Sequence, residues 1–170
     1  MRATLTIALS GLLATPAYAA TLDVSVEIPK LNVAEYHRPY VAIWVEGADQ
    51  KVAANLAVWY QSKDTAEGHG TKWLPDLRQW WRKSGRTLSV PIDGVTGPTR
   101  PAGKHALSFT DRQQLKGLAP GQYTLVVEAV REVGGRELLK IPFAWPAKAA
   151  ETGSAQGSSE LGAVSLTVSP

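Results

Sequence analysis

The histidines are the first residues in this chain that could do chemistry. His37, His69 and His105 are the only three, and cysteine is absent. Imidazole and carboxylate ligands suit zinc, copper or iron, so a hairpin that brought Glu35, His37 and His69 together would give a weak metal site. The histidines lack the H-x-x-x-H spacing of helical metal sites. We therefore predict no dedicated metal centre and keep this set as an alternative.

The nucleophiles and carboxylates form no recognisable catalytic pattern. No G-x-S-x-G sequence is present, and the aspartates and glutamates are scattered singly along the chain. The absence of cysteine excludes thiolate metal sites, iron–sulfur clusters and thiol catalysis. We expect a protein that is not an enzyme.

Three tryptophans lie within nine residues, which is more than one helix face normally needs. Trp73, Trp80 and Trp81 could cover an open end of the core, where each indole would bury about 150–250 Å². They could instead form a flat aromatic surface for a planar ligand such as a flavin or haem, with Arg78 or Arg82 binding its anionic groups. The candidate ligand or partner surface comprises Trp73, Arg78, Trp80, Trp81 and the more distant His37.

The segment from Ile92 to Pro101 is the most suggestive in the chain. Its two glycines and two prolines favour a fixed, exposed loop rather than a strand. It resembles the Asp-x-x-Ser/Thr-Gly-Ala-Ser/Thr signal by which periplasmic flavin transferases attach FMN to a threonine through a phosphoester. Pro98 stands where that signal has alanine, and proline fixes φ and removes a backbone donor. The alternative is a plain turn between two strands. The positions that match in register are Asp93, Thr96, Gly97 and Thr99, and the resemblance implies FMN on Thr99.

Residues 1–19 have the composition of a signal peptide. Arg2 precedes an apolar run from Leu5 to Ala14, and small residues stand at Ala17 and Ala19, before a cut at Ala20. An apolar run this short cannot span a hydrocarbon core of about 30 Å. We expect export to a bacterial periplasm and no membrane insertion of the mature protein.

The charge of the chain is nearly balanced. It carries 18 Lys and Arg residues against 15 Asp and Glu residues, a formal net charge of +3. Such a balance, without a block of like charge, predicts neither nucleic-acid binding nor adhesion to an anionic membrane.

Alternating apolar residues and frequent turns predict a mainly β protein. From Trp73 the apolar spacing becomes helical, and this helix ends at Gly85. The pattern favours an all-β, immunoglobulin-like antiparallel β-sandwich with one short helix. Strands are predicted at Thr21–Ile28, Tyr40–Glu46, Leu56–Tyr60, Thr87–Val90, Lys104–Phe109, Tyr123–Val130 and Glu137–Phe143.

The predicted organisation is a signal peptide over residues 1–19, a β-sandwich domain over residues 20–146 and a tail over residues 147–170. Ala147–Ser159 is rich in small and polar residues, which is typical of a flexible linker or a long loop. Leu161–Val168 recovers an alternating pattern and is a candidate terminal strand.

Six segments carry a family resemblance: Tyr36–Trp44, Leu56–Tyr60, Trp73–Trp81, Asp93–Pro101, Pro120–Ala129 and Gly134–Glu137. In this order they resemble a bacterial family of predicted periplasmic proteins, domain of unknown function 2271. The resemblance implies a companion of membrane proteins with PepSY domains and of periplasmic flavin transferases, in a setting of electron transfer or iron reduction. Members commonly have Ser-Gly-Ala-Thr where this chain has Thr96-Gly97-Pro98-Thr99.

These observations favour a non-enzymatic carrier or docking module in a flavin- or iron-linked electron-transfer system. Its cofactor would be covalent FMN on Thr99, and its partner a membrane electron-transfer protein or a flavin transferase. Two alternatives stay open: a structural or interaction module without a cofactor, and a weak metal-binding protein.

Overall fold

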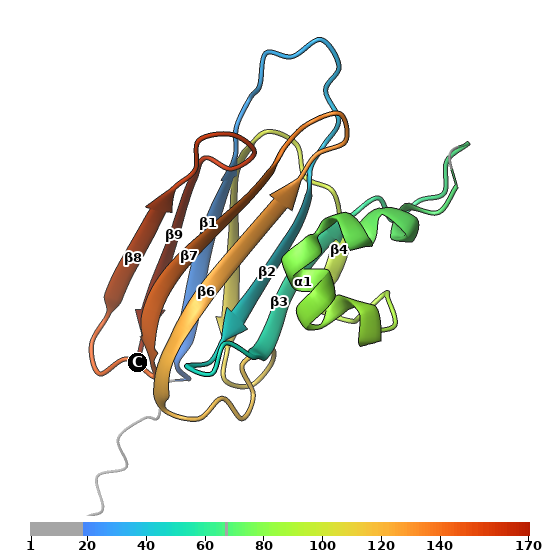
Figure 1. Cartoon of the computed structure of the whole chain (residues 1–170). Coiled ribbons are helices and arrows are strands. Elements are labelled where there is room, and N and C mark those ends of the chain that lie inside the picture. Colours follow the sequence, from blue (N-terminus) through green and yellow to red (C-terminus); the bar gives the residue numbers. More distant parts are fainter. Residues whose placement is uncertain (1–18, 67) are drawn as a thin grey trace, which may run out of the picture.

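The computed structural model describes residues 19–66 and 68–170, which form two β-sheets packed face to face (Figure 1). The predicted signal peptide, apart from its last residue, lies outside the described residues. The prediction of a mainly β sandwich with one short α-helix is confirmed. The four-stranded sheet has the order β5-β1-β9-β8 and contains β1 (Thr21–Ile28), β5 (Gly103–Thr110), β8 (Glu151–Gln156) and β9 (Ala163–Ser169). The five-stranded sheet has the order β4-β3-β2-β6-β7 and contains β2 (Tyr40–Glu46), β3 (Val52–Tyr60), β4 (Thr96–Pro98), β6 (Gly121–Val130) and β7 (Arg136–Trp145).

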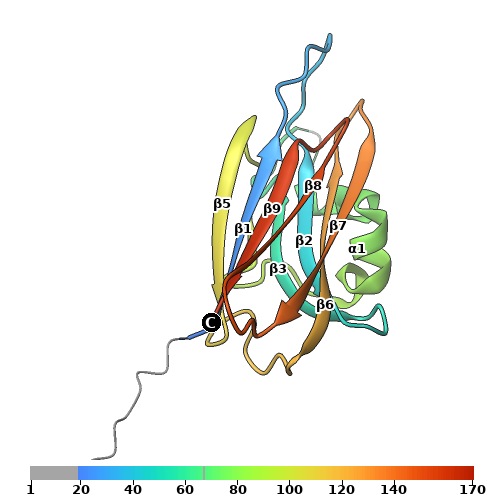
Figure 2. The ribbon, with the colours of Figure 1, turned by 90° about the vertical axis from the view of Figure 1, so that its left-hand side faces the viewer.

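The inner faces of the two sheets enclose the main core. In β1 the side chains of Leu22, Val24, Val26 and Ile28 are at most 2% exposed, and the residues between them are less buried. This is the alternation expected of a strand with one buried face. Figure 2 shows the two layers side by side, with α1 on the outer side of the five-stranded sheet.

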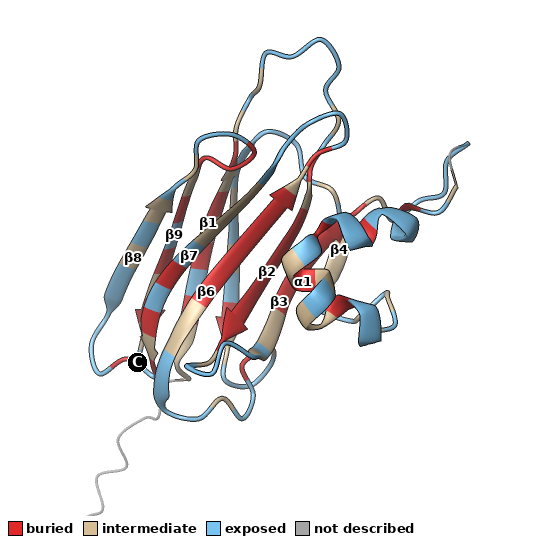
Figure 3. Ribbon diagram, viewed as in Figure 1, coloured by how far each residue is buried: buried red, intermediate tan, exposed pale blue. Residues whose placement is uncertain are grey.

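The five-stranded sheet is covered on its outer face as well. A helical segment lies there, made of η1 (Gly70–Asp76), α1 (Arg78–Lys83) and η2 (Gly85–Thr87). Strands β2, β3 and β6 therefore contain continuous runs of buried residues rather than an alternation (Figure 3). The second apolar cluster, which fills this layer, comprises Ala42, Trp44, Val58, Tyr60, Leu74, Leu77, Trp80 and Val126.

Two buried carboxylates of the sheet anchor α1 at its ends. Glu128 on β6 is 0% exposed and accepts hydrogen bonds from the backbone N–H of Gln79 at 3.1 Å and of Trp80 at 2.9 Å. It thus supplies acceptors for backbone N–H groups in the first turn of α1, where the N-cap residue Leu77 makes no side-chain hydrogen bond. At the other end, the Lys83 ammonium lies 2.9 Å from Glu46 Oε1. Burial would raise the pKa of Glu46, but hydrogen bonds from Lys83 and Trp44 hold it below its ordinary value.

The helical segment is less regular than its spacing predicts. It starts as the 3₁₀ helix η1, which contains Pro75, and changes to α1 across Leu77, whose ψ of 70° is not helical. A 3₁₀ helix turns every 3.0 residues rather than 3.6, so Trp73 leaves the face that buries Leu77 and Trp80. Trp73 is 43% exposed, whereas Trp80 is 0% exposed. The tryptophans therefore do not cover an open end of the sandwich, and Trp80 packs on the outer face of a sheet.

Between β3 and β5 the structure corrects one strand prediction and one loop prediction. Thr87–Val90 is not a strand: Thr87 ends η2, and Leu88 and Val90 pack against the second apolar cluster without pairing. The adjoining segment that was predicted to be a loop contains β4, which pairs in parallel with β3. Val58 N–H donates to Val95 C=O, and Thr99 N–H donates to Tyr60 C=O. Pro98 can occupy this edge strand because its nitrogen faces away from β3, on the side of β4 that pairs with no other strand.

The flexible linker predicted for Ala147–Ser159 is also wrong, because β8 lies within it and pairs with β9. Gly153 shows why small residues are needed there: a Cβ at this position would lie 2.6 Å from Ile141 Cγ2 of β7. Glu137 of β7 accepts hydrogen bonds from the backbone N–H of Ser158, Ser159 and Leu161. The turn between β8 and β9 is therefore tied to the body of the sandwich, and β9 lies at the predicted terminal strand.

Candidate functional site

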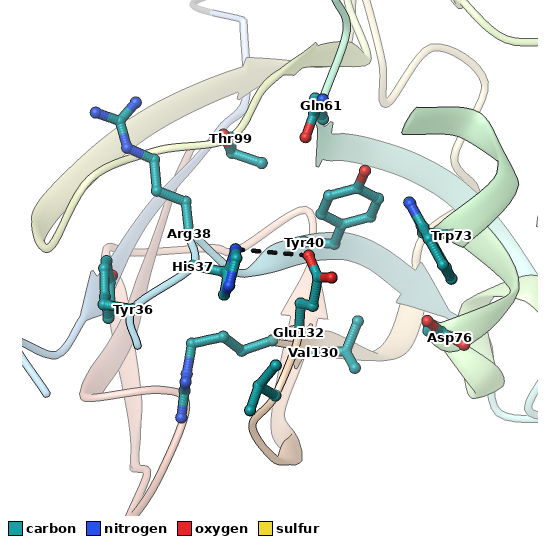
Figure 4. A pocket seen from close by; sticks show the side chains of 12 residues that line it. Tyr36, His37, Arg38, Tyr40, Gln61, Trp73, Asp76, Thr99, Val130 and Glu132 are labelled. Carbon is teal, nitrogen blue, oxygen red and sulfur yellow. Dashed lines mark ion pairs between the residues drawn. The ribbon is translucent and has the colours of Figure 1, made fainter. Parts of the chain in front are cut away.

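A cavity of about 480 Å³ lies where β2, β3 and β6 meet the loops at one end of the five-stranded sheet (Figure 4). We call it the candidate cavity. The connection from β1 to β2 contributes Tyr36, His37 and Arg38, and β2 contributes Tyr40. Its aromatic and charged lining, drawn from segments far apart in the sequence, is typical of a ligand site.

The other walls come from four further segments. Gln61 follows β3, Trp73 and Asp76 belong to η1, and Thr99 follows β4. The end of β6 and the turn after it supply residues 130–133. In Figure 4 Trp73 and Tyr36 lie at opposite sides of the view, with His37 and Tyr40 between them.

Tyr40 connects the cavity to the helical segment. Its hydroxyl donates a hydrogen bond to the Gly70 carbonyl at 3.0 Å, and its ring meets that of Tyr60 edge-on at 6.4 Å. Burial raises the pKa of Tyr40 above its ordinary value of 10, and the negative charges of Glu132 and Asp76 add to this shift. The hydroxyl therefore stays protonated in the physiological range and acts as a fixed donor.

His37 contacts a carboxylate on each ring nitrogen. Its Nε2 lies 2.9 Å from Glu35 Oε1, and its Nδ1 lies 3.5 Å from Glu132 Oε2. Only the second contact joins two residues that line the cavity, and Figure 4 marks it with a dashed line. Both contacts hold the imidazole at the β1–β2 connection.

The structure separates the histidines proposed as metal ligands. His69 pairs with Asp64, and His105 contacts the Pro101 carbonyl at 2.8 Å, so neither shares the carboxylates of His37. Among the described residues, no group of three or more His, Cys, Asp or Glu side chains is arranged to hold a metal ion. No observation favours the set of Glu35, His37 and His69.

The residues of the flavin-type signal have different environments. The Thr96 hydroxyl is engaged in a local turn, since it accepts from Ile92 N–H at 2.9 Å and donates to Ile92 C=O at 3.1 Å. Gly97 lies in β4 near Trp59, and Asp93 is exposed in the preceding turn. Thr99 alone among them lines the candidate cavity. Its side chain makes no hydrogen bond within the described part of the chain.

The candidate aromatic surface is divided. The Trp80 indole is in the second apolar cluster and donates from Nε1 to Asn55 Oδ1 at 2.8 Å. Trp81 is half-buried, Arg78 is exposed, and neither lines the cavity. The cavity therefore unites three predicted site residues, His37, Trp73 and Thr99, and excludes the others.

Several cavity residues had no predicted role. Tyr36, Arg38 and Tyr40 lie in the conspicuous Tyr36–Tyr40 segment, where two aromatic and two basic side chains flank a proline. That composition is the signal that could have found them. Glu132 and Asp76 carry no such signal, because nothing in a single carboxylate reveals what the fold brings near it.

Comparison with known proteins identifies the family. None of the helices formed by residues 19–66 and 68–170 is long and apolar enough to cross a membrane. No curated protein and no solved structure matches the chain. The family model of the predicted periplasmic protein (DUF2271) matches residues 21–163, which include strands β1 to β8, the first residue of β9 and every wall of the cavity. The chain therefore belongs to the DUF2271 family of predicted periplasmic proteins.

Proposed function

We propose that this protein is a non-enzymatic flavin carrier of the periplasm, with FMN attached to Thr99 through a phosphoester. It would exchange electrons with a membrane electron-transfer protein, and a separate flavin transferase would load it. Asp93, Thr96 and Gly97 would form the sequence that the transferase recognises.

The environment of the two threonine hydroxyls is the observation that carries this proposal. Thr96 is engaged through both its donor and its acceptor function with Ile92. Thr99 is half-buried on a cavity wall with its side-chain oxygen unbonded in the described part of the chain. The position that the signal designates for modification is thus the one whose hydroxyl is available.

Positive charge near Thr99 supports a phosphate at this position. Arg38 lines the same cavity and, among the described residues, forms no ion pair. Arg100, the next residue after Thr99, is exposed, and its guanidinium carbon lies 5.5 Å from the centroid of the Trp59 ring. Guanidinium groups are well suited to bind phosphate oxygens.

The loading step balances with a flavin dinucleotide as donor. The Thr99 oxygen forms a bond to the phosphorus on the riboflavin side, and the pyrophosphate bond breaks. The nucleoside monophosphate leaves, and the hydroxyl proton passes to a base of the transferase. No electrons are transferred in this step.

Intact mass of the periplasmic protein, produced together with a flavin transferase, tests the proposal. We expect the mass of FMN minus water on the wild type and on Thr99→Ser, which keeps a hydroxyl, and its loss in the nearly isosteric Thr99→Val. Thr152→Val, at an exposed position of β8, is the control and should be labelled like the wild type. An unmodified wild type, or label retained in Thr99→Val, would contradict the proposal.

A further inference from the structure

Most of the exposed large hydrophobic side chains in the described part of the chain line the candidate cavity. Among the described residues there are four: Val33, Tyr36, Trp73 and Val133. Tyr36, Trp73 and Val133 line the cavity, and Val33 does not. Single exposed apolar residues are ordinary, but their concentration at one hollow indicates a surface that a ligand covers.

Val133 adds backbone strain to this exposure. It has a φ of 53° at the tip between β6 and β7, and its side chain is 73% exposed. A β-branched residue is a genuine outlier in this left-handed region. Asparagine or glycine would adopt this positive φ more readily than valine, and a valine this exposed adds little to the core. Such strain is concentrated at ligand sites and other functional positions.

The dimensions and chemistry of the cavity fit a planar ring with polar edges. Its volume of about 480 Å³ is in the usual range for small-molecule sites. Trp73 is 43% exposed on the cavity wall, with the Lys72 ammonium 4.6 Å from its ring centroid, and in the view of Figure 4 the Tyr40 hydroxyl and the Gln61 amide lie between Trp73 and Thr99. Aromatic side chains stack readily on flat heterocycles.

We propose that the candidate cavity holds the isoalloxazine ring of the flavin tethered at Thr99, with the ring stacked on Trp73 and the Val133 tip against its apolar edge. This inference rests on the proposed function. It adds that the ring is docked on the protein rather than free in solvent at the end of its ribityl chain.

Time-resolved flavin fluorescence of the labelled protein tests the docking. A ring against the Trp73 indole has a short, quenched lifetime, and an undocked ring has the long lifetime of free FMN. We expect the short component to dominate in the wild type. In Val133→Asn, which keeps the quenching indole, the ratio of docked to undocked ring should fall about threefold, equivalent to about 0.7 kcal/mol.

Matched variants exclude a general loss of structure. Val33→Ala alters an exposed valine outside the cavity lining and should leave the lifetimes unchanged. Both Trp73 variants lack the quenching indole, so their docking is read from the fluorescence anisotropy of the flavin: Trp73→Phe, which keeps a stacking ring, should retain the high anisotropy of a docked ring, and Trp73→Ala should have the low anisotropy of a free one. Val133→Asn should unfold at the same or a higher temperature, since asparagine tolerates its backbone.

The outcomes distinguish the two proposals. A labelled wild type whose flavin has the lifetime of free FMN would overturn the docking and leave the carrier function intact. Short lifetimes that do not respond to Val133→Asn, or a high anisotropy retained in Trp73→Ala, would overturn it as well. A wild type without label would overturn both.

Discussion

Trp73 and Trp80 belong to one helical segment and have opposite environments. Trp80 is 0% exposed, packs on β2, β3 and β6, and finds a hydrogen-bond acceptor in Asn55. Trp73 is 43% exposed on the wall of the candidate cavity, with the Lys72 ammonium 4.6 Å from its ring centroid. The same residue type thus holds the fold in one place and is available to a ligand in the other.

Replacing each tryptophan by alanine should give the largest difference in the free energy of unfolding between the two positions. Trp80→Ala should lower the free energy of unfolding by about 4 kcal/mol, because it leaves a cavity in the second apolar cluster. Trp73→Ala should change it by less than about 0.5 kcal/mol. Urea unfolding followed by circular dichroism measures both, and equal losses would contradict the distinction between the two sites.

Two carboxylates, Glu128 on β6 and Glu132 in the turn after it, should also differ in their contribution to stability. Glu128→Ala leaves the N–H groups of α1 and the nearby Arg136 without their buried partner, so we expect a loss of about 3 kcal/mol. Glu132, which is exposed and contacts His37, is the matched control. Glu132→Ala should cost less than about 0.5 kcal/mol in the same urea experiment. A small effect of Glu128→Ala would mean that α1 needs no anchor from the sheet.

Acid should lower the stability of the protein through a different region, the turn between β8 and β9. Burial would raise the pKa of Glu137, but hydrogen bonds from the backbone of Ser158, Leu161 and Ser159 lower it from 4.5 to about 2. Because the pKa of Glu137 is lower in the folded protein than in the unfolded chain, the ionised carboxylate stabilises the fold. Its contribution to the free energy of unfolding is complete above about pH 4.5 and is lost as the pH falls toward 2.

We expect a loss of about 1–2 kcal/mol over that interval after allowance for solvent screening. Glu137→Gln should flatten this part of the stability–pH curve, and Glu151→Gln, at an exposed position, should not. Parallel curves for Glu137→Gln and the wild type would show that the turn is held by other contacts.

The smallest effect concerns the segment next to the cavity. Pro98 occupies the free edge of β4 and lacks the N–H that a transferase could pair with there. Pro98→Ala restores this donor and the alanine of the signal, so FMN attachment should be about fivefold faster, as one backbone hydrogen bond of about 1 kcal/mol allows. The labelled fraction over time, read by mass, measures it. Equal rates would show that Pro98 is no obstacle.

Local patterns predicted most strands because they depend on neighbours in the sequence. The alternation of Thr21–Ile28 coincides with β1, and the turn at residues 47–51 joins β2 to β3. The same reasoning failed at Ala147–Ser159, where composition indicated flexibility. The small residues there allow β8 to pack closely against β7, and the sequence around β8 does not indicate that packing.

The candidate site was only partly predictable for the same reason. His37, Trp73 and Thr99 were singled out separately, from residue type and from a resemblance to a modification signal. Their union in one cavity depends on β2, η1 and the end of β4 meeting at one end of the sheet.

The sequence by itself determined the mainly β fold class, the family and the threonine whose hydroxyl matches the flavin signal, because these follow from periodicity and short motifs. The tertiary structure alone decided which tryptophan is buried, which threonine lines the cavity and which other side chains share it. These placements depend on residues dozens of positions away. The Glu128 carboxylate accepts from the backbone N–H of Trp80, and the Tyr60 carbonyl accepts from the backbone N–H of Thr99, and only the folded chain brings these groups into contact.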